Sequence, residues 1–324
     1  MNVWYRAERI LGQMKQLISI VIPIYNEEKN LDQLYKRLNH LMDLEKKYDF
    51  EIISVEHGSD DSSLKKLLEI RRRDKRVKIL QLSKNFGSAD AGIVAGLNFA
   101  QGNACVILMA DLQEPPELIS QFLKYWEKEY EIVYGIVKKR PGTSLVRRIS
   151  SVIFYKILNI MTGNIFPENV SDFRLIDKKV YQVVNQMEER NKFLRGLIAW
   201  SGFNQIGIPF ERKERFAGKS KADFLTVLKV AANGIFSFSY LPLKIVTILG
   251  FLLSIISFLM IFYQILLFVI YGRGAPGIST VVILVSFLFS MLFLILGVMG
   301  EYISRIYDEV KSRPNFIVKN KIGF

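Results

Sequence analysis

The chain has 324 residues but only one cysteine and two histidines. The single cysteine, Cys105, cannot form an intrachain disulfide, and three such residues cannot supply a four-ligand Cys/His zinc site. No G-x-x-x-x-G-K-[ST] run occurs, and no G-x-G-x-x-G run follows a strand pattern. These absences exclude a disulfide scaffold, a Cys/His zinc module, a P-loop and a dinucleotide fingerprint. A reducing compartment fits the cysteine content, and any bound phosphate must be neutralised by side chains or a metal.

The composition excludes an intrinsically disordered chain, because half of the residues are hydrophobic and only 23% are charged. The formal net charge of +13 points to an anionic partner, which is a nucleic acid, an anionic lipid surface or a phosphorylated substrate. The basic runs at 71–73 and 138–140 are typical of solvated faces, and no nucleic-acid recognition motif accompanies them. We therefore expect no nucleic-acid partner.

Uncharged residues are concentrated near the C-terminus, in 28 residues between Lys244 and Arg273 and 27 residues between Arg273 and Glu301. A bilayer core of ~30 Å needs ~20 helical residues, so each stretch is long enough to span it. We expect an antiparallel transmembrane hairpin over residues 243–303, with spans at about 245–271 and 278–300. The alternative, a buried helix of a soluble protein, is disfavoured by two such stretches in succession.

Basic residues predict the orientation of this hairpin, because only Arg273 lies at its turn and several lie at its open end. Those at the open end are Lys244, Arg305, Lys311, Arg313, Lys319 and Lys321. By the positive-inside rule, both termini and the residues before the hairpin face the cytoplasm. No signal peptide with a cleavage site is recognisable. Residues 1–16 are thus expected to be a tail that stays where it is made, and residues 304–324 a cytoplasmic C-terminal tail.

Two further segments combine apolar residues at helical spacing with cationic or small polar ones, Ser144–Met161 and Ala222–Tyr240. This pattern is typical of a helix lying in the lipid headgroup layer, so residues 222–242 are interpreted as an interfacial region. An amphipathic helix packed on its own domain fits both segments equally well.

Between residues 17 and 221, strand patterns alternate with helical ones. Strands are expected at Leu17–Ile24, Phe50–Val55, Val77–Leu82, Ala104–Met109 and Ile132–Tyr134. The alternation predicts an α/β domain with a mostly parallel sheet. Because ligands of such sheets bind at the carboxyl ends of the strands, the loops after the first four strands form the candidate site.

The run from Met109 to Glu117 places Asp111 just beyond a buried strand. A carboxylate there can bridge a divalent cation to a diphosphate, because Mg²⁺ typically uses one or two carboxylates together with phosphate oxygens. The alternative is a helix start, at which Glu114 and Glu117 favour the first turn electrostatically. These residues alone leave both interpretations open.

Several motifs follow one another in order: Pro23-Ile24-Tyr25-Asn26-Glu27, Gly58-Ser59, Asn85-Phe86-Gly87, Ala110-Asp111-Leu112-Gln113, Ser171-Asp172-Phe173-Arg174-Leu175 and Arg215-Phe216-Ala217-Gly218-Lys219-Ser220-Lys221. The first four resemble the inverting glycosyltransferases of family 2, whose GT-A fold is a Rossmann-like nucleotide-sugar domain. With the last two and the hairpin, residues 17 to 318 resemble the polyprenyl-phosphate glycosyltransferases. Within these, the bactoprenol glucosyltransferases are closer and the dolichyl-phosphate mannose synthases more distant.

The resemblance implies a role for each matching residue. Nucleotide binding falls to Pro23, Tyr25, Glu27, Glu56 and Gln113, and Asp111 would hold Mg²⁺ or Mn²⁺. Asp172, which with Asp111 is expected to be catalytic, matches the acidic residue near the acceptor. Phosphate and acceptor binding fall to Arg174, Arg215, Ser220 and Lys221. The alternatives are strand-end packing for Tyr25, a core salt bridge for Arg174 and a solvated basic loop for 215–221.

Two positions depart from the family's usual pattern. Met109 stands where the family often has the first aspartate of Asp-x-Asp, and His57 stands where it often has an aspartate before Gly-Ser. One carboxylate still suffices for Mg²⁺, since the diphosphate supplies the other charged ligands, but weaker affinity or a different metal preference is expected. For His57, capping of the turn is favoured over a contact with the donor.

The resemblance implies an enzyme of the bacterial inner membrane, acting in cell-envelope glycosylation. It would transfer one sugar with inversion, glucose from UDP-glucose by preference, to undecaprenyl phosphate at the cytoplasmic face. GDP-mannose and a modified arabinose donor stay open. A phosphate monoester has a second pKa near ~6 and is mostly ionised at neutral pH. Asp172 is therefore expected mainly to orient, with proton abstraction secondary.

Two other functions fit parts of the sequence. A processive polysaccharide synthase shares the catalytic domain, but it usually needs more spans and a Gln-x-x-Arg-Trp motif, which the run Arg195–Trp200 does not match. A non-catalytic, membrane-anchored nucleotide-sugar binder is suggested by Met109 and His57. Because a two-helix hairpin buries little surface by itself, a homo-oligomer formed through the transmembrane region is expected.

Overall fold

A computed structural model of the protein describes residues 15–139, 170–190, 192–213, 236, 239–271 and 277–324. The chain divides into two compact units, one made of residues 1–229 and 314–324 and the other of residues 230–313. The amphipathic segment expected at 144–161 lies outside the described residues, and so does most of the one at 222–240.

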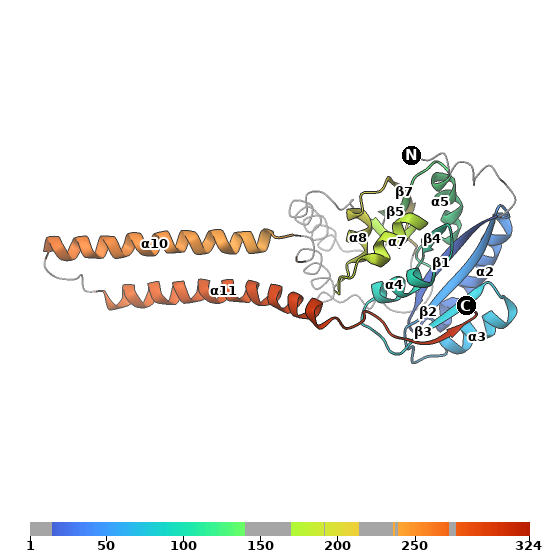
Figure 1. Ribbon diagram of the computed structural model, residues 1–324, viewed down its shortest axis with the longest axis horizontal. Coiled ribbons are helices and arrows are strands. Elements are labelled where there is room, and N and C mark those ends of the chain that lie inside the picture. The colour runs from blue at the N-terminus through green and yellow to red at the C-terminus, as the bar shows by residue number, and fades with distance from the viewer. Residues whose placement is uncertain (1–14, 140–169, 191, 214–235, 237–238, 272–276) are drawn as a thin grey trace. The chain divides into compact units, whose positions relative to one another are not determined.

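The first unit is built on an eight-stranded sheet with the order β7-β5-β6-β4-β1-β2-β3-β8 (Figure 1). Its strands are β1 (Gln16–Ile24), β2 (Tyr48–Glu56), β3 (Val77–Leu82), β4 (Ala104–Ile107), β5 (Ile132–Lys139), β6 (Val170–Asp177), β7 (Gln205–Glu211) and β8 (Val318–Ile322). Neighbours are parallel except where β6 pairs with β4 and β5 and where β8 pairs with β3. The predicted α/β class with a mostly parallel sheet is confirmed.

Helices cover both faces of this sheet, which explains the continuous apolar run of β1. Ile20 and Ile22 pack on one face, and Val21, which points the opposite way, packs on the other. The first face is covered by α2 (Glu28–Leu44), α3 (Ser63–Arg73) and α5 (Ile119–Trp126). The second is covered by α4 (Ala89–Phe99), α7 (Lys178–Gln186) and α8 (Leu194–Trp200).

The C-terminal segment is not the tail that the sequence suggested for residues 304–324. The last helix continues to Lys311, and Val318–Ile322 form β8 at the edge of the sheet. The pattern conceals this strand, because only its two ends are apolar and lysines occupy its middle, as is common on protected sheet edges. The first unit is therefore assembled from two pieces of chain that flank the hairpin in the sequence.

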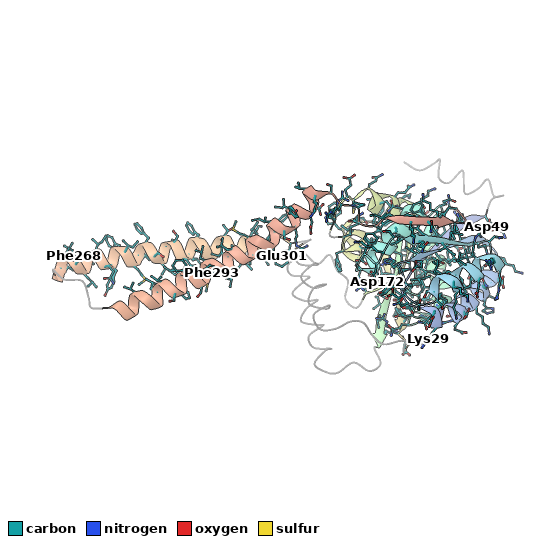
Figure 2. All side chains as sticks on the ribbon, turned by 90° about the horizontal axis from the view of Figure 1, so that it is seen from below. Lys29, Asp49, Asp172, Phe268, Phe293 and Glu301 are labelled. Atoms are coloured by element: carbon teal, nitrogen blue, oxygen red, sulfur yellow. The ribbon has the colours of Figure 1, made fainter. Side chains whose placement is uncertain are left out.

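The second unit contains two long apolar helices, α10 (Leu241–Tyr271) and α11 (Ile278–Lys311), of 31 and 34 residues. Both contain stretches long and apolar enough to cross a membrane. Large apolar side chains such as Phe268 and Phe293 project from them and are more than half exposed (Figure 2). Such exposure is unfavourable in water, so the helices form a candidate transmembrane hairpin.

Candidate active site

The loops predicted to form the site leave the sheet at one edge. Because β1 is parallel to β2 and β4, and β2 to β3, the residues that follow these strands gather there. β6 runs the opposite way beside β4, with Ile107 opposite Arg174, so the start of β6 lies at this edge as well. The fold therefore brings Asp111, after β4, to the same edge as Asp172, near the start of β6.

Reciprocal hydrogen bonds join the loops that follow β1 and β2. The Asn26 N–H donates to Ser59 Oγ at 3.1 Å, and the Asp60 N–H donates to Asn26 Oδ1 at 2.9 Å. These bonds bring Tyr25 and Glu27, the neighbours of Asn26, alongside the loop after β2. Their contact with a nucleotide stays a prediction.

Pro23 and Glu56 are both buried and shape this part of the edge. The pairing of β1 with β4 ends at Val21 and Ile107, so no hydrogen bond to β4 is needed at Pro23, two residues further on. Proline, which has no N–H to donate, is therefore tolerated there. A carboxylate oxygen of Glu56 accepts a hydrogen bond from the Ser59 N–H, which holds the turn after β2. Both residues thus shape the loops after β1 and β2. Direct contact of either residue with a nucleotide stays a prediction.

His57 is packed inside the domain. Its imidazole lies against α4, where a Cβ added to Gly92 would stand 1.8 Å from Nε2. Burial lowers the pKa of His57 to about 4, so the ring is neutral at physiological pH. His57 therefore serves in packing, and glycine at position 92 makes room for its ring.

Asp111 is buried in the loop after β4, where its Oδ1 accepts a hydrogen bond from the Gln113 N–H at 3.2 Å. Gln113 is tied to the chain just beyond β7 by two bonds. The Lys213 N–H donates to the Gln113 carbonyl at 3.0 Å, and Gln113 Nε2 donates to the Lys213 carbonyl at 3.4 Å. The predicted phosphate-binding residues Arg215, Ser220 and Lys221 follow Lys213 in the sequence and lie outside the described residues.

Glu114, considered from the sequence only for a helix start, belongs to the site. The Ser171 hydroxyl donates to its Oε1, whereas Oε2 has no hydrogen-bond partner among the described residues. Burial raises the pKa of Glu114 to about 7, with the charges of Asp172 and Asp111 acting in the same direction. The bond to Ser171 links the loop after β4 to the start of β6.

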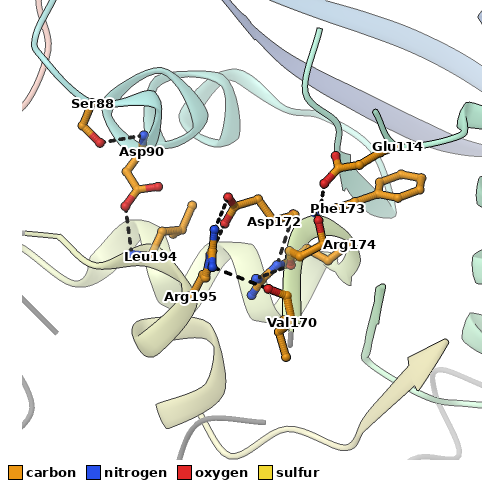
Figure 3. A network of polar contacts seen from close by, with 10 residues as sticks. Ser88, Asp90, Glu114, Val170, Asp172, Phe173, Arg174, Leu194 and Arg195 are labelled. Carbon is orange, nitrogen blue, oxygen red and sulfur yellow. Dashed lines mark hydrogen bonds and ion pairs between the residues drawn. The ribbon is translucent and has the colours of Figure 1, made fainter. Parts of the chain in front are cut away.

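Asp172 is paired with Arg195 of α8, which the sequence did not single out (Figure 3). Both carboxylate oxygens accept hydrogen bonds, Oδ2 from Arg195 Nη2 at 2.5 Å and Oδ1 from Arg195 Nε. Burial opposes ionisation of Asp172, but the charge and hydrogen bonds of Arg195 outweigh it and hold the pKa of Asp172 below its ordinary value. The carboxylate of Asp172 is therefore ionised, and both of its oxygens are hydrogen-bonded to Arg195.

Arg174, predicted to lie beside Asp172, is buried and donates to two main-chain carbonyls. These belong to Ser171, at 3.0 Å, and to Asp172, at 3.3 Å. Burial lowers the pKa of Arg174 to about 10, which leaves the guanidinium charged at neutral pH. Its guanidinium is thus held against the first residues of β6 by the backbone of the strand itself.

Asp90, in the first turn of α4, approaches the same pair (Figure 3). Its Oδ2 accepts a hydrogen bond from the Leu194 N–H at 3.5 Å, at the start of the helix that carries Arg195. Burial, together with the neighbouring charge of Asp172, raises the pKa of Asp90 to about 6. The site therefore contains two carboxyl groups with raised pKa values, Asp90 and Glu114, close to the ionised carboxylate of Asp172.

A divalent cation fits this site only with help from a ligand. Within the described residues, no group of three or more His, Cys, Asp and Glu side chains could hold a metal ion. Asp111 is one buried carboxylate at the exit of β4, and Mg²⁺ usually completes so sparse a protein site with phosphate oxygens and water. The described residues of this edge therefore do not form a closed protein cage, and their donor set fits a cation only if phosphate oxygens and water complete its coordination.

A mostly parallel sheet covered by helices on both faces, with carboxylates and arginines gathered at the carboxyl ends of its strands, is an α/β architecture of the GT-A type. The sequence profile of Glycosyl transferase family 2 matches residues 19–184. The chain belongs to glycosyltransferase family 2, and the protein is a glycosyltransferase.

Named relatives match the chain over almost its whole length. An uncharacterized glycosyltransferase of Synechocystis sp. is 40% identical, with 94% of this chain and 96% of the relative covered. The Bacillus subtilis glycosyltransferase YkcC is 41% identical, with 94% of each covered. The bactoprenol glucosyl transferase of Shigella phage SfII is 33% identical over 302 residues, with 93% of this chain and 97% of the relative covered.

Proposed function

We propose that the protein transfers a single sugar from a nucleoside diphosphate donor, with UDP-glucose preferred, to the phosphate of a polyprenol. The match to the phage bactoprenol glucosyl transferase carries this proposal. It leaves 22 residues of this chain unmatched, fewer than the length of either candidate span. The shared length thus includes at least part of each candidate span, and a membrane anchor of this kind suits a membrane-embedded acceptor. Undecaprenyl phosphate is the expected acceptor.

In this reaction an acceptor phosphate oxygen forms a bond to the anomeric carbon while the bond from that carbon to the donor diphosphate breaks. In-line attack inverts the anomeric centre. Because the acceptor oxygen is already ionised at neutral pH, with a second pKa near ~6, the site needs no strong base. The harder task is to bring two anions together, and Arg174 of β6 and Arg195 of α8 would lower that repulsion.

The residue roles of this proposal follow the placement of the loops. Nucleotide contacts are assigned to Pro23, Tyr25, Glu27, Glu56 and Gln113, and phosphate contacts to Arg174, Arg215, Ser220 and Lys221. Asp111 would hold Mg²⁺ or Mn²⁺ together with the donor diphosphate, and the cation would neutralise the leaving diphosphate.

The same proposal includes a place in the cell and an assembly. The transferase domain and both termini face the cytoplasm at the bacterial inner membrane, residues 222–242 lie at the lipid interface, and copies associate through the hairpin. The surplus of basic residues at the open end of the hairpin supports this orientation.

The test incubates detergent-purified protein with radiolabelled UDP-glucose, undecaprenyl phosphate and Mg²⁺, followed by organic extraction. We expect label in the lipid phase as a single sugar, and its loss with EDTA. A long polymer would favour a processive synthase. No lipid label with UDP-glucose, GDP-mannose or an arabinose donor would refute the proposal.

A further inference from the structure

We propose that Arg195 binds the phosphate group of the acceptor and that Asp172 is a positioning residue that holds Arg195 for this contact. The inference rests on the proposed function, because it assigns a residue to the acceptor of that reaction. It starts from the pair that joins β6 to α8 (Figure 3).

The geometry of the pair holds the guanidinium of Arg195 in one orientation. Nε and Nη2 of Arg195 engage both oxygens of Asp172, so the plane of the guanidinium is fixed before a ligand arrives. A pre-oriented arginine loses little freedom when it binds an anion. A carboxylate whose two oxygens both accept from a cation is, in contrast, a poor proton acceptor.

The charges around the pair favour an anionic ligand. Besides Arg195, the guanidinium groups of Arg174 and Arg212 act on the single carboxylate of Asp172. Asp90 and Glu114 also lie nearby, but burial raises their pKa values to about 6 and about 7, so at neutral pH they are less fully ionised than Asp172. Three guanidinium groups thus lie around Asp172, and a phosphate group would be attracted to them.

Exposure distinguishes the arginine that a ligand can reach. One third of the Arg195 side chain is exposed (33%), whereas Arg174 is 4% exposed and bonded to the backbone. Of these two arginines, Arg195 is therefore the one that a phosphate can reach.

The order of strands places this contact on the acceptor side of the site. β4, which leads to Asp111, lies between β1 and β6. The loops expected to hold the nucleotide follow β1 and β2, on one side of β4, whereas Asp172 and Arg195 lie on the other. A phosphate at Arg195 would thus face Asp111 from the side opposite to the nucleotide loops, as an attacking acceptor must.

The test compares wild-type protein with Arg195→Gln, Arg195→Lys, Asp172→Asn and the double variant Arg195→Gln/Asp172→Asn, all full-length in detergent. Two affinities are measured without turnover, for undecaprenyl phosphate in micelles and for UDP, together with KM and kcat for transfer. Arg195→Gln should weaken binding of undecaprenyl phosphate and raise its KM by about ten- to hundredfold, as expected for a lost charged hydrogen bond, and leave UDP affinity unchanged.

The other variants test whether Asp172 acts through Arg195. The affinity of Arg195→Lys for undecaprenyl phosphate, and its KM, should lie between those of Arg195→Gln and wild type, because lysine keeps the positive charge but lacks the two parallel N–H donors of a guanidinium. Asp172→Asn should raise the same KM, and the double variant should be no worse than Arg195→Gln. Arg76→Gln is the matched control, since Arg76 makes a similar pair with Asp74 before β3, at the opposite edge of the sheet.

Three results would overturn the inference: weaker UDP binding in Arg195→Gln, which would place this arginine on the donor diphosphate; unchanged binding of undecaprenyl phosphate; or additive effects in the double variant. The proposed function fails separately, if wild type binds undecaprenyl phosphate in an Arg195-dependent manner but transfers no sugar to it.

Discussion

At the residue scale, Asp111 and Asp172 are two carboxylates at one edge of a sheet, but their surroundings give them different chemistry. Asp111 lies in the loop after β4 and accepts a hydrogen bond from a nearby backbone N–H. Asp172 is neutralised by an arginine through both of its oxygens. The first is suited to a cation shared with a ligand, and the second to holding a side chain in place.

Substitution of each aspartate by asparagine should separate these roles. Asp111→Asn should abolish lipid-linked product, since the only protein carboxylate assigned to the metal is lost. Asp172→Asn should leave a residual rate, lowered by about ten- to hundredfold, with a modest shift of the pH profile. Initial rates at saturating donor, with folding checked by circular dichroism, decide the matter. Equal inactivity of the two variants would show that Asp172 does more than orient.

Glu114 should make stability depend on pH. Its folded pKa of about 7 lies above the ordinary value of 4.5, so between these values the folded protein binds more protons than the unfolded chain. Stability therefore falls as pH rises through this window, by about 3 kcal/mol when the shift is fully developed. Glu114→Gln should flatten the decline between pH 5 and 8 in thermal unfolding, whereas the exposed Glu69→Gln should not. Parallel curves for wild type and Glu114→Gln would contradict this.

His57 and Gly92 form a packed pair that double substitution can test. Gly92→Ala places a Cβ where the His57 ring lies and should lower the free energy of unfolding by about 1–3 kcal/mol, despite the higher helix propensity of alanine. His57→Ser vacates that space, so Gly92→Ala should cost much less in its presence. A double-mutant cycle by denaturant unfolding measures the coupling. Simple additivity would mean that the ring moves aside at no cost.

At the element scale, the C-terminal strand and the residues before it hold two loops near the site. The Ser83 N–H, after β3, donates to the Ile317 carbonyl at 2.9 Å, and Asn315 Nδ2 donates to the Glu189 carbonyl at 3.1 Å. Phe316 packs in the apolar cluster that covers the second face of the sheet. This segment thus ties the end of β3 to the chain that precedes α8.

Removal of the Phe316 ring should therefore weaken both stability and transfer. Phe316→Ala should lower the free energy of unfolding by about 2 kcal/mol, since a half-buried ring is lost. Lys319→Ala, on the exposed face of β8, is the control and should change little. Thermal unfolding and initial rates of both variants provide the measurement. A fully stable, fully active Phe316→Ala would show that β8 alone anchors the segment.

At the scale of the whole molecule, the transferase unit is interrupted in sequence by the candidate hairpin, with residues 314–324 returning to the sheet. Both ends of the hairpin are thus joined to one folded unit. This connectivity requires both ends of the hairpin to lie on the same side of a membrane, in agreement with an even number of spans.

Labelling of single cysteines tests the orientation. Cys105 is buried, and burial raises its thiol pKa, so the native background should be low. In intact cells, Gly274→Cys should react with a membrane-impermeant maleimide, whereas Lys319→Cys should react only after permeabilisation. The reverse pattern would invert the proposed topology.

Local patterns in the sequence were enough to predict the parallel core strands, the candidate hairpin and the family. Apolar periodicity and uncharged length are properties of neighbouring residues, so they predict elements without knowledge of the fold. The motifs after β1, β2 and β4 could likewise be placed, because the carboxyl ends of parallel strands gather at one edge. A lone charge in the apolar run Leu194–Trp200 was the available signal for Arg195.

Contacts between distant residues could be decided only by the tertiary structure. Asp172 and Arg195 are 23 positions apart, and Asn320 reaches Gln81 across 239. No local pattern encodes such pairings. The lysine-rich sequence of β8 likewise has the composition of a solvent-exposed tail, so it does not indicate a strand. The sequence by itself thus determined the kind of domain and the residue types at its edge. The tertiary structure decided which carboxylate is neutralised by an arginine and which has its pKa raised, because these differences depend on burial and on charges brought together only by folding.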